Sequence, residues 1–276
     1  MSAARPRMLL VAGMHRSGTS ALARVLSLCG GELPRTLFPA AEGDNDLGYW
    51  ESKPLIEHHE HLFRMLGTTM LDPDPIDSRW FDTGQAMEAR HDLMSIVRRE
   101  WPGEGLMVVK EPRICRLMPL WRDVVEELGA EAAWVLPVRE PGEVAASLVR
   151  RGGIDAARAE RSWLSHVVQA ERWTRGLPRV VVSYDALLDG WRGVVARIAA
   201  VSPAGLDAAR AEREVDAFLE PGRRRHAVTA ASADSDVRAV RDAMFDAART
   251  GTPPSVDSHG AEALDRAWRR LLMRCG

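Results

Sequence analysis

The sequence predicts an α/β fold in which helices cover both faces of a central parallel sheet. Short apolar runs rich in valine and leucine alternate with longer segments of helical periodicity, the pattern of parallel strands joined by helices. The first apolar run leads directly into a loop framed by glycines. After about residue 202 the strand signal ends and only helical patterns follow. We therefore expect one domain, with an α/β core over residues 7–202 and a helical extension over residues 203–276.

Each predicted strand is a short and nearly continuous apolar run, because a strand covered on both faces has no polar side. Charged or turn residues bound every run. The strands are expected at Met8–Ala12, Leu106–Val109, Ala132–Val138 and Val180–Ser183. Ligands of such sheets bind at the carboxyl ends of the strands, where this chain carries GMHRSGTS, KEPR, REP and YD. The polar residues in all four segments indicate a site at that edge.

Helices are expected where apolar residues recur with helical spacing between and after these strands. Pro141 is well placed to begin one of them, since proline is favoured in the first helical turn. The core helices are expected at Thr19–Cys29, Lys53–Leu66, Gln85–Glu100, Cys115–Leu128, Gly142–Arg150, Ala156–Thr174 and Ala186–Ala200. Those of the extension are expected at Asp207–Leu219, Asp234–Thr250 and Ala261–Arg274. The loops over residues 30–50 and 71–83 are long enough to be lids or binding loops.

Composition and charge argue against several kinds of partner. The 276 residues carry a formal net charge of −2, which favours neither nucleic acid nor an anionic membrane. Three cysteines, Cys29, Cys115 and Cys275, lack metal-ligand spacing, and their odd number favours a reduced setting. No apolar run reaches the roughly 18 residues of a membrane helix, and the N-terminal run is too short for a signal peptide. We expect a cytoplasmic protein without a membrane partner.

The loop after the first predicted strand has the layout of a phosphate-binding site. Gly13 and Gly18 frame it between a strand and a helix, so backbone N–H groups and the helix N-terminus can surround an anion. The residues expected to bind the phosphate are His15, Arg16, Ser17, Gly18, Thr19 and Ser20. Nucleoside triphosphatases have a lysine where this chain has Thr19. We therefore expect a three-layer, P-loop-like fold whose loop binds a phosphate other than that of ATP or GTP.

A second pattern follows the third predicted strand. Arg139 leaves the strand, Pro141 starts a helix, and Ser147 lies eight residues after the arginine. Together with RSGTS after the first strand, this spacing resembles the sulfotransferases that use 3′-phosphoadenosine-5′-phosphosulfate (PAPS). The resemblance runs from about Met8 to Ala227. It is closest to bacterial members with GMHRSGTS, K-D-P-R, R-x-P and S-L segments, with KEPR here in place of KDPR.

The resemblance implies a sulfotransferase-like domain that moves a sulfuryl group from PAPS to a hydroxyl or amine of a small-molecule or carbohydrate acceptor. The first motif would hold the 5′-phosphosulfate, and Arg139 with Ser147 would hold the 3′-phosphate. Tyr184 would lie near the adenine. A basic loop near residues 221–226, with Arg224 and Arg225, would close over the 3′-phosphate. No metal is expected, because the transferring group carries less charge than a γ-phosphoryl group.

The KEPR segment bears on catalysis. In cytosolic members of the family the comparable segment is K-T-H, in which the lysine contacts the sulfuryl group and the histidine is the base. Lys110 matches the lysine, but Pro112 stands at the position of the histidine. Other branches use a glutamate from the loop after the first helix, which makes Glu51 the preferred base and Glu111 the second candidate. Arg16 and Lys110 are expected to stabilise the charge that grows on the bridging oxygen.

Two alternatives stay open at this stage. One is a P-loop NTPase or small-molecule kinase with an altered loop. The threonine in the loop and the lack of aspartate after the second and third strands argue against it. The other is a nucleotide-binding protein without turnover.

An aromatic-lined acceptor pocket is suggested by residues of the two long loops, namely Tyr49, Trp50, Trp80 and Phe81. His58, His59 and His61 are expected on a polar helix face.

Overall fold

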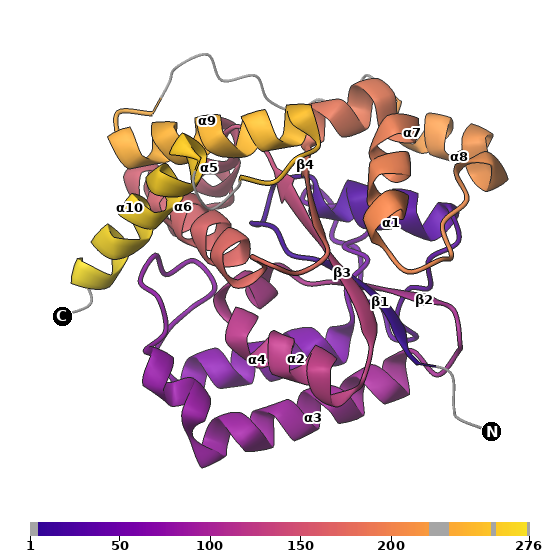
Figure 1. Ribbon diagram of the computed structural model, residues 1–276, viewed down its shortest axis with the longest axis horizontal. Helices are drawn as coiled ribbons and strands as arrows, with labels where there is room; N and C mark the ends of the chain where they lie inside the picture. Colours follow the sequence, from indigo (N-terminus) through magenta and orange to yellow (C-terminus); the bar gives the residue numbers. More distant parts are fainter. Residues whose placement is uncertain (1–4, 221–231, 255–257, 275–276) are drawn as a thin grey trace.

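A four-stranded parallel sheet lies at the centre of the structure, a computed structural model that describes residues 5–220, 232–254 and 258–274 (Figure 1). The strands are β1 (Arg7–Val11), β2 (Leu106–Lys110), β3 (Glu131–Val138) and β4 (Arg179–Ser183). Their order is β2–β1–β3–β4, and the three pairings are parallel. The predicted α/β fold with a central parallel sheet is confirmed, and each strand lies within one residue of its predicted bounds.

Helices surround the sheet on both sides. The α-helices of the described residues are α1 (Thr19–Leu28), α2 (Lys53–Met65), α3 (Gly84–Glu100), α4 (Met118–Glu127), α5 (Pro141–Arg151), α6 (Ala156–Trp173), α7 (Tyr184–Val201), α8 (Glu212–Phe218), α9 (Ser235–Thr250) and α10 (His259–Arg274). The 3₁₀ helices are η1 (Ser78–Asp82), η2 (Pro112–Arg116) and η3 (Ala208–Ala211). In the part of the chain that the structure describes, no helix has both the length and the apolar composition to cross a membrane.

The structure differs from the predicted helices at two places. One helix is expected over Cys115–Leu128, but η2 and α4 follow each other there. A continuous helix would press the Pro119 ring against the carbonyl group four residues earlier, so the helix starts anew just before the proline. The region Asp207–Leu219 likewise divides into η3 and α8, because the backbone of Ala211 leaves the helical range (φ −142°, ψ 35°).

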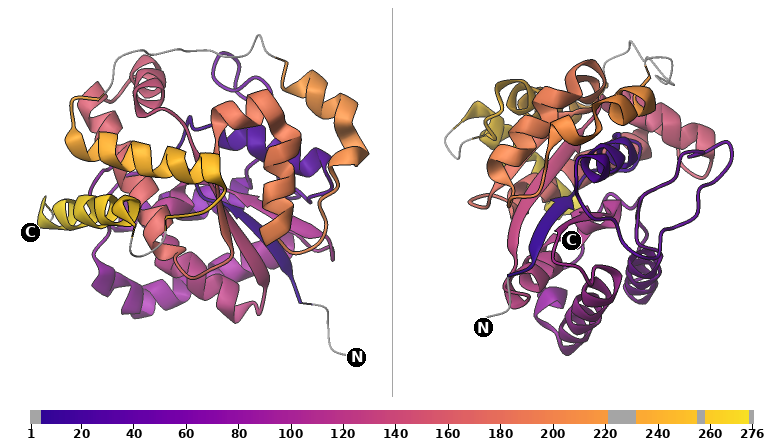
Figure 2. Two further views of the ribbon diagram at one scale, coloured as in Figure 1. Left: turned by 45° about the horizontal axis from the view of Figure 1, so that its top comes forward. Right: turned by 90° about the vertical axis from the view of Figure 1, so that its right-hand side faces the viewer.

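The sheet has an apolar core on each face, because alternate residues of a strand point to opposite sides. In β1, Leu9 and Val11 pack in the core that includes residues of α1, α7 and α8. Met8 and Leu10 pack in the other core, with residues of α2, α3, α4 and α6. Figure 1 shows α1, α7 and α8 on one side of the sheet and α2, α3 and α4 on the other, and Figure 2 shows the same layers from two further directions. The strands are therefore apolar on both faces, as the sequence pattern requires.

The strand order opens a crevice at the carboxyl end of β1. The chain reaches β2 on one side of β1 and then crosses to β3 on the other side. Connections that leave a strand in opposite directions create the position where ligands of open α/β sheets bind. Gly13 lies at this point, and a Cβ atom there would come within 2.5 Å of the Pro137 Cγ atom in β3. Position 13 therefore has to be glycine for the loop to stay against β3.

The long loop between α1 and α2 is fastened where it approaches α2. The Phe38 N–H donates to the Glu51 carbonyl at 2.8 Å. The buried Glu100 carboxylate, at the end of α3, accepts from the backbone N–H of Thr36 at 2.9 Å. Satisfied backbone groups of this kind fix a loop that lacks regular secondary structure. The segment that carries Glu51 is thereby held in place from two sides.

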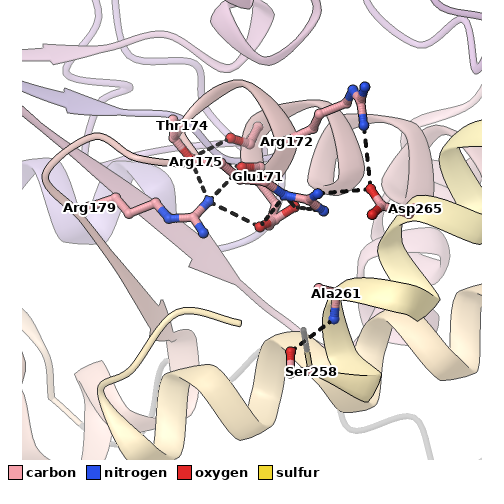
Figure 3. Close-up of polar contacts among 9 residues, drawn as sticks. Glu171, Arg172, Thr174, Arg175, Arg179, Ser258, Ala261 and Asp265 are labelled. Atoms are coloured by element: carbon pink, nitrogen blue, oxygen red, sulfur yellow. Dashed lines mark hydrogen bonds and ion pairs between the residues drawn. The ribbon is translucent and has the colours of Figure 1, made fainter. Parts of the chain in front are cut away.

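A group of ion pairs attaches α10 to the end of α6 (Figure 3). Glu171 is fully buried, and its carboxylate accepts from Arg175 at 2.8 Å and pairs with Arg179 at 3.1 Å. Arg175 also donates to Asp265 of α10 at 2.9 Å, and Arg172 pairs with the same carboxylate at 3.4 Å. Glu171 therefore links α6, the start of β4 and α10.

Replacing Glu171 with Gln should lower the free energy of unfolding by about 3 kcal/mol, because two largely buried guanidinium groups lose their counter-charge. Asp265→Asn is the matched control. Asp265 is partly exposed, so its loss should cost less than about 1 kcal/mol. Urea denaturation measures both free energies. Equal losses in the two variants would contradict the central role of Glu171.

Candidate functional site

The loop after β1 has the backbone geometry of an anion cradle. Arg16 and Gly18 adopt left-handed conformations, with φ angles of 67° and 79°. α1 begins at Thr19 with no side-chain cap and no acidic residue in its first turn, so its first N–H groups have no carboxylate of the helix as a partner. The Ser17 hydroxyl is buried and has no hydrogen-bond partner among the described residues. These features fit a phosphate or sulfate oxygen at this position.

Tyr184 and Arg139 join the loop to the ends of β4 and β3. The Tyr184 ring lies so close to Gly18 that a Cβ atom at position 18 would collide with it. The Arg139 guanidinium lies over the same ring, 4.7 Å from its centroid. Arg139 Nη1 donates to the Arg16 carbonyl at 3.2 Å, and its Nε donates to Glu143 at 2.6 Å. The residues of the second sequence motif therefore contact those of the first.

Arg16 extends from the loop toward α5. Its Nε donates to the hydroxyl of Ser147 at 2.8 Å, across 131 residues of sequence. Its Nη1 donates to Asp44 at 2.9 Å. Ser147 is buried, whereas Arg16 is about one-fifth exposed. The structure thus brings together Arg16, Arg139 and Ser147, the three residues that the sequence assigned to the two ends of one nucleotide.

Lys110, at the end of β2, points to the same place. Its Nζ donates to the Ser20 hydroxyl and to the Tyr49 carbonyl, each at 3.1 Å, and forms an ion pair with Glu51. Both Lys110 and Glu51 are almost fully buried. Burial raises the pKa of Glu51 above its ordinary value, and the charge of Lys110 acts in the opposite direction. Glu51 is therefore a carboxylate with an increased tendency to accept a proton.

Glu111, the second candidate for the base, belongs to a different group of contacts. It is fully buried, and its carboxylate is bound by His59 and Arg113. Burial alone would raise the pKa of Glu111, but Arg113 and His59 bring it well below its usual range. His59 is buried and not on a polar face as the sequence suggested, and its Nε2 accepts from Trp121 at 3.0 Å. Its Nδ1 therefore carries the proton that is donated to Glu111.

His15 lies next to this buried group and lines the pocket. Burial lowers its pKa well below the ordinary value, and the nearby Arg113 lowers it further. The His166 ring packs against it edge to face, with centroids 6.3 Å apart. The Nε2 atom of His15 is buried and has no hydrogen-bond partner among the described residues. A neutral imidazole at this position can hydrogen-bond a bound group without adding charge.

One pocket, lined by many of these side chains but not by the buried Ser17 and Ser147, encloses about 1090 Å³, part of it open to solvent. Its polar lining includes loop residues, the strand ends and the segment before α2, namely His15, Arg16, Thr19, Ser20, Asp44, Tyr49, Glu51, Lys110 and Arg139. Glu111 is not among its lining residues. The pocket lies where the strand order and the sequence motifs both predict a site.

Some lining residues carried no sequence signal. Asp44 and Arg151 contribute opposite charges, and an apolar wall is formed by Leu188 with Phe218 and Leu219. Asp44 lies in a long loop that also carries Glu32, Glu42, Asn45 and Asp46, so only its contacts distinguish it from them. Phe218 and Leu219 lie at the C-terminal end of α8, and periodicity does not reveal that this end lines a pocket.

The aromatic residues of the two long loops divide between the pocket and the core. Tyr49 and Trp50 line the pocket. Trp80 is buried in the core and packs edge to face with Phe81, with centroids 5.1 Å apart, and neither of them lines the pocket. Of the four aromatic residues expected in the pocket, only the two of the first loop line it.

Arg224, Arg225 and Cys275 lie outside the described residues. Cys29 and Cys115 are buried free thiols. Within residues 5–220, 232–254 and 258–274, no three His, Cys, Asp or Glu side chains gather as metal ligands do.

Neither a protein-family profile nor a curated protein matches the sequence. Among solved structures, the chain is similar to one described as the sulfotransferase domain from the Synechococcus PCC 7002 olefin synthase. The TM-score is 0.45 and the identity 18%, over 95% of this chain and 94% of that chain. At so low a similarity, the function has to be inferred from the residues of this chain.

The buried carboxylate of Glu111 predicts how stability depends on pH. Because its pKa is lower in the folded protein than the ordinary 4.5, its contribution is complete above that pH and is lost as the pH falls below it. Glu111→Gln should therefore lower the free energy of unfolding by about 3 kcal/mol at neutral pH, and by less under acidic conditions.

Urea denaturation of both proteins at several pH values from neutral to about pH 3 measures this difference. Glu60→Gln is the control, since Glu60 also pairs with Arg113, at 2.6 Å, but is about one-third exposed. It should cost under about 1 kcal/mol. A Glu111→Gln difference that stays constant with pH would contradict the assignment.

Proposed function

We propose that this protein is a sulfotransferase that moves a sulfuryl group from PAPS to a hydroxyl or amine of a small-molecule or carbohydrate acceptor. The observation that carries the proposal is the convergence of two sequence motifs on one pocket. Arg139 donates to the carbonyl of Arg16, and Ser147 accepts from the side chain of Arg16. These contacts join the loop after β1 to the end of β3 and to α5. A nucleotide with phosphates at both its 5′ and 3′ positions matches such a pair of joined anion sites.

The residues present fit PAPS at three points. The loop after β1 offers backbone N–H groups and the buried hydroxyl of Ser17 to the 5′-phosphosulfate. Arg139, Ser147 and Arg16 provide donors for the 3′-phosphate. Tyr184 and the apolar wall that includes Leu188 are suited to the adenine ring. When bound, PAPS would supply a sulfuryl group activated by its phosphate leaving group.

Lys110 and Glu51 are the groups assigned to the chemical step. Lys110 Nζ contacts the first turn of α1 through Ser20 and would neutralise negative charge on the leaving oxygen. Glu51 would accept the proton of the acceptor hydroxyl or amine, for which its raised pKa is favourable. The pairing of the two keeps both charges compensated. The sequence motif assigns Arg16 to the same charge, although its side chain is directed to Ser147 and Asp44 in the structure.

The contacts favour Glu51 over Glu111 as the base. Glu51 lines the pocket, whereas Glu111 is enclosed by His59 and Arg113. A carboxylate whose pKa is strongly lowered is a weak proton acceptor at neutral pH, and an enclosed one does not reach a substrate. We assign Glu111 a positioning role at the end of β2 instead.

Adenosine 3′,5′-bisphosphate, the product of PAPS, should raise the midpoint of thermal unfolding by roughly 5 °C at saturating concentration, since it binds only the folded state. ATP with Mg²⁺ should have little effect, because Thr19 replaces the lysine that contacts a γ-phosphate. Scanning fluorimetry with the two ligands measures this. A shift with ATP–Mg²⁺ and none with the bisphosphate would favour a kinase or NTPase and overturn the proposal.

Arg139→Ala provides the matched variant for this experiment. It should reduce the shift with the bisphosphate strongly and the shift with adenosine 5′-phosphate weakly, because Arg139 is assigned to the 3′-phosphate. Equal losses for the two nucleotides would show that Arg139 does not read the 3′-phosphate.

Replacing Glu51 with Gln should reduce turnover by at least about 100-fold while leaving bisphosphate binding nearly unchanged. In the wild-type protein, kcat/KM should fall with acidity around a pH above 4.5, because Glu51 has to be ionised to accept a proton and its pKa is raised. Transfer from radiolabelled PAPS to a panel of phenols and sugars measures both. Glu57→Gln, an exposed charge change on α2, is the control. Full activity of Glu51→Gln would remove Glu51 as the base.

A further inference from the structure

Asp44 holds two arginines of the pocket through its two carboxylate oxygens. Oδ1 accepts from Arg16 at 2.9 Å, and Oδ2 pairs with Arg151 at 2.6 Å. Tyr49 donates its hydroxyl to Oδ2 as well. Two guanidinium groups and a hydroxyl that converge on a pair of oxygens are the donors that proteins use for phosphate. Here the carboxylate of Asp44 takes up all three donors.

Asp44 is linked through Arg16 and Arg151 to the helix that carries Ser147 of the second motif. Ser147 and Arg151 are four residues apart on α5, so they lie one turn apart on the same face of the helix. Arg16 contacts Ser147 directly through its Nε, and its Nη1 donates to Asp44, which in turn binds Arg151. The carboxylate of Asp44 is therefore held beside the hydroxyl that is assigned to the 3′-phosphate.

We propose that Asp44 holds the place of the 3′-phosphate until the nucleotide binds, and that Arg151 is a further residue that binds this phosphate. The inference rests on the proposed function and assigns the part of the pocket that discriminates between nucleotides. A phosphate with two negative charges cannot share the same cations with a carboxylate at contact distance, so its binding displaces Asp44. A nucleotide with a 3′-hydroxyl lacks the charge that displaces the carboxylate. Asp44 thus increases the selectivity for a 3′-phosphate and reduces the affinity for it.

The exchange also reaches the segment before α2. Tyr49 binds Asp44 through its hydroxyl and Lys110 through its carbonyl, so it links the phosphate end of the pocket to the Lys110–Glu51 pair. Displacement of Asp44 releases the hydroxyl of Tyr49. The loop that carries Asp44 therefore connects nucleotide binding with the position of the assigned base.

Calorimetric titration with adenosine 3′,5′-bisphosphate and with adenosine 5′-phosphate tests the exchange. Asp44→Asn should tighten binding of the bisphosphate by about tenfold, because one like charge leaves the site. It should change the affinity for adenosine 5′-phosphate by less than about twofold. Arg151→Ala should weaken the bisphosphate by about tenfold, as expected when one cation of a phosphate site is lost.

Two neighbours provide matched controls. Glu42→Gln removes an exposed carboxylate from the same loop, and Arg150→Ala removes an exposed guanidinium from the same helix end. Both should leave the affinity for the bisphosphate within about twofold of wild type. If these variants change the affinity as much as Asp44→Asn or Arg151→Ala does, the changes reflect the overall charge of the region and not a specific site. That outcome would overturn the inference.

The remaining outcomes are also decisive. Unchanged or weaker bisphosphate binding by Asp44→Asn, or an equal gain for both nucleotides, overturns the inference while the proposed function stands.

If the wild-type protein binds neither nucleotide, the proposed function fails, and sodium sulfate becomes the probe. A larger rise of the unfolding midpoint with sulfate in Asp44→Asn than in wild type then supports anion exchange at Arg16 and Arg151. Equal rises overturn it.

Discussion

The close approach of the loop after β1 to β3 and α7 is the constraint on which the site depends. Gly13 lies against Pro137, and Gly18 lies against the ring of Tyr184, so a side chain at either position would separate the loop from its neighbours. Only at this short range does Arg139 reach the carbonyl of Arg16. Because Gly13 and Gly18 have no side chains, motifs that are far apart in the sequence can come together and form one surface. Phosphate binding by backbone N–H groups needs the same close packing.

Charge compensation explains the remaining geometry of the pocket. Within the described residues, each cation assigned to the nucleotide has a carboxylate partner: Glu51 for Lys110, Glu143 for Arg139, and Asp44 for Arg16 and Arg151. Buried or half-buried cations without such partners would carry a large desolvation cost. A site built for an anion therefore needs acidic residues that stabilise it before the anion arrives. Acidic residues in such a pocket can thus contribute to anion binding by keeping the cations of the site charged and in place.

The sequence predicts the strands, the helices and the motif residues of the site better than it predicts the contacts between distant segments. Strands, helices and the residues that follow β1, β2 and β3 are readable, because apolar periodicity and glycine positions reflect local requirements. The helix break at Pro119 is a local effect that periodicity alone overlooks. Asp44, Arg151 and the buried state of His59 were not readable, because each depends on contacts between segments distant in sequence. Arg224 and Arg225 stay predictions, as does the small-molecule or carbohydrate class of the acceptor.

Asp44 and Glu51 show how two carboxylates of one loop can take different roles. The side chain of Asp44 is about one-fifth exposed, and its partners Arg16 and Arg151 also contact solvent. Water and counterions can therefore replace its contacts at small cost. Glu51 is almost fully buried against Lys110, and the backbone contact of its carbonyl with Phe38 fixes its position. Separating that pair without replacing the charge would cost several kcal/mol, on the order of the penalty for breaking a buried ion pair. Burial thus assigns the exchangeable carboxylate to the phosphate end of the pocket and the fixed one to the reacting end.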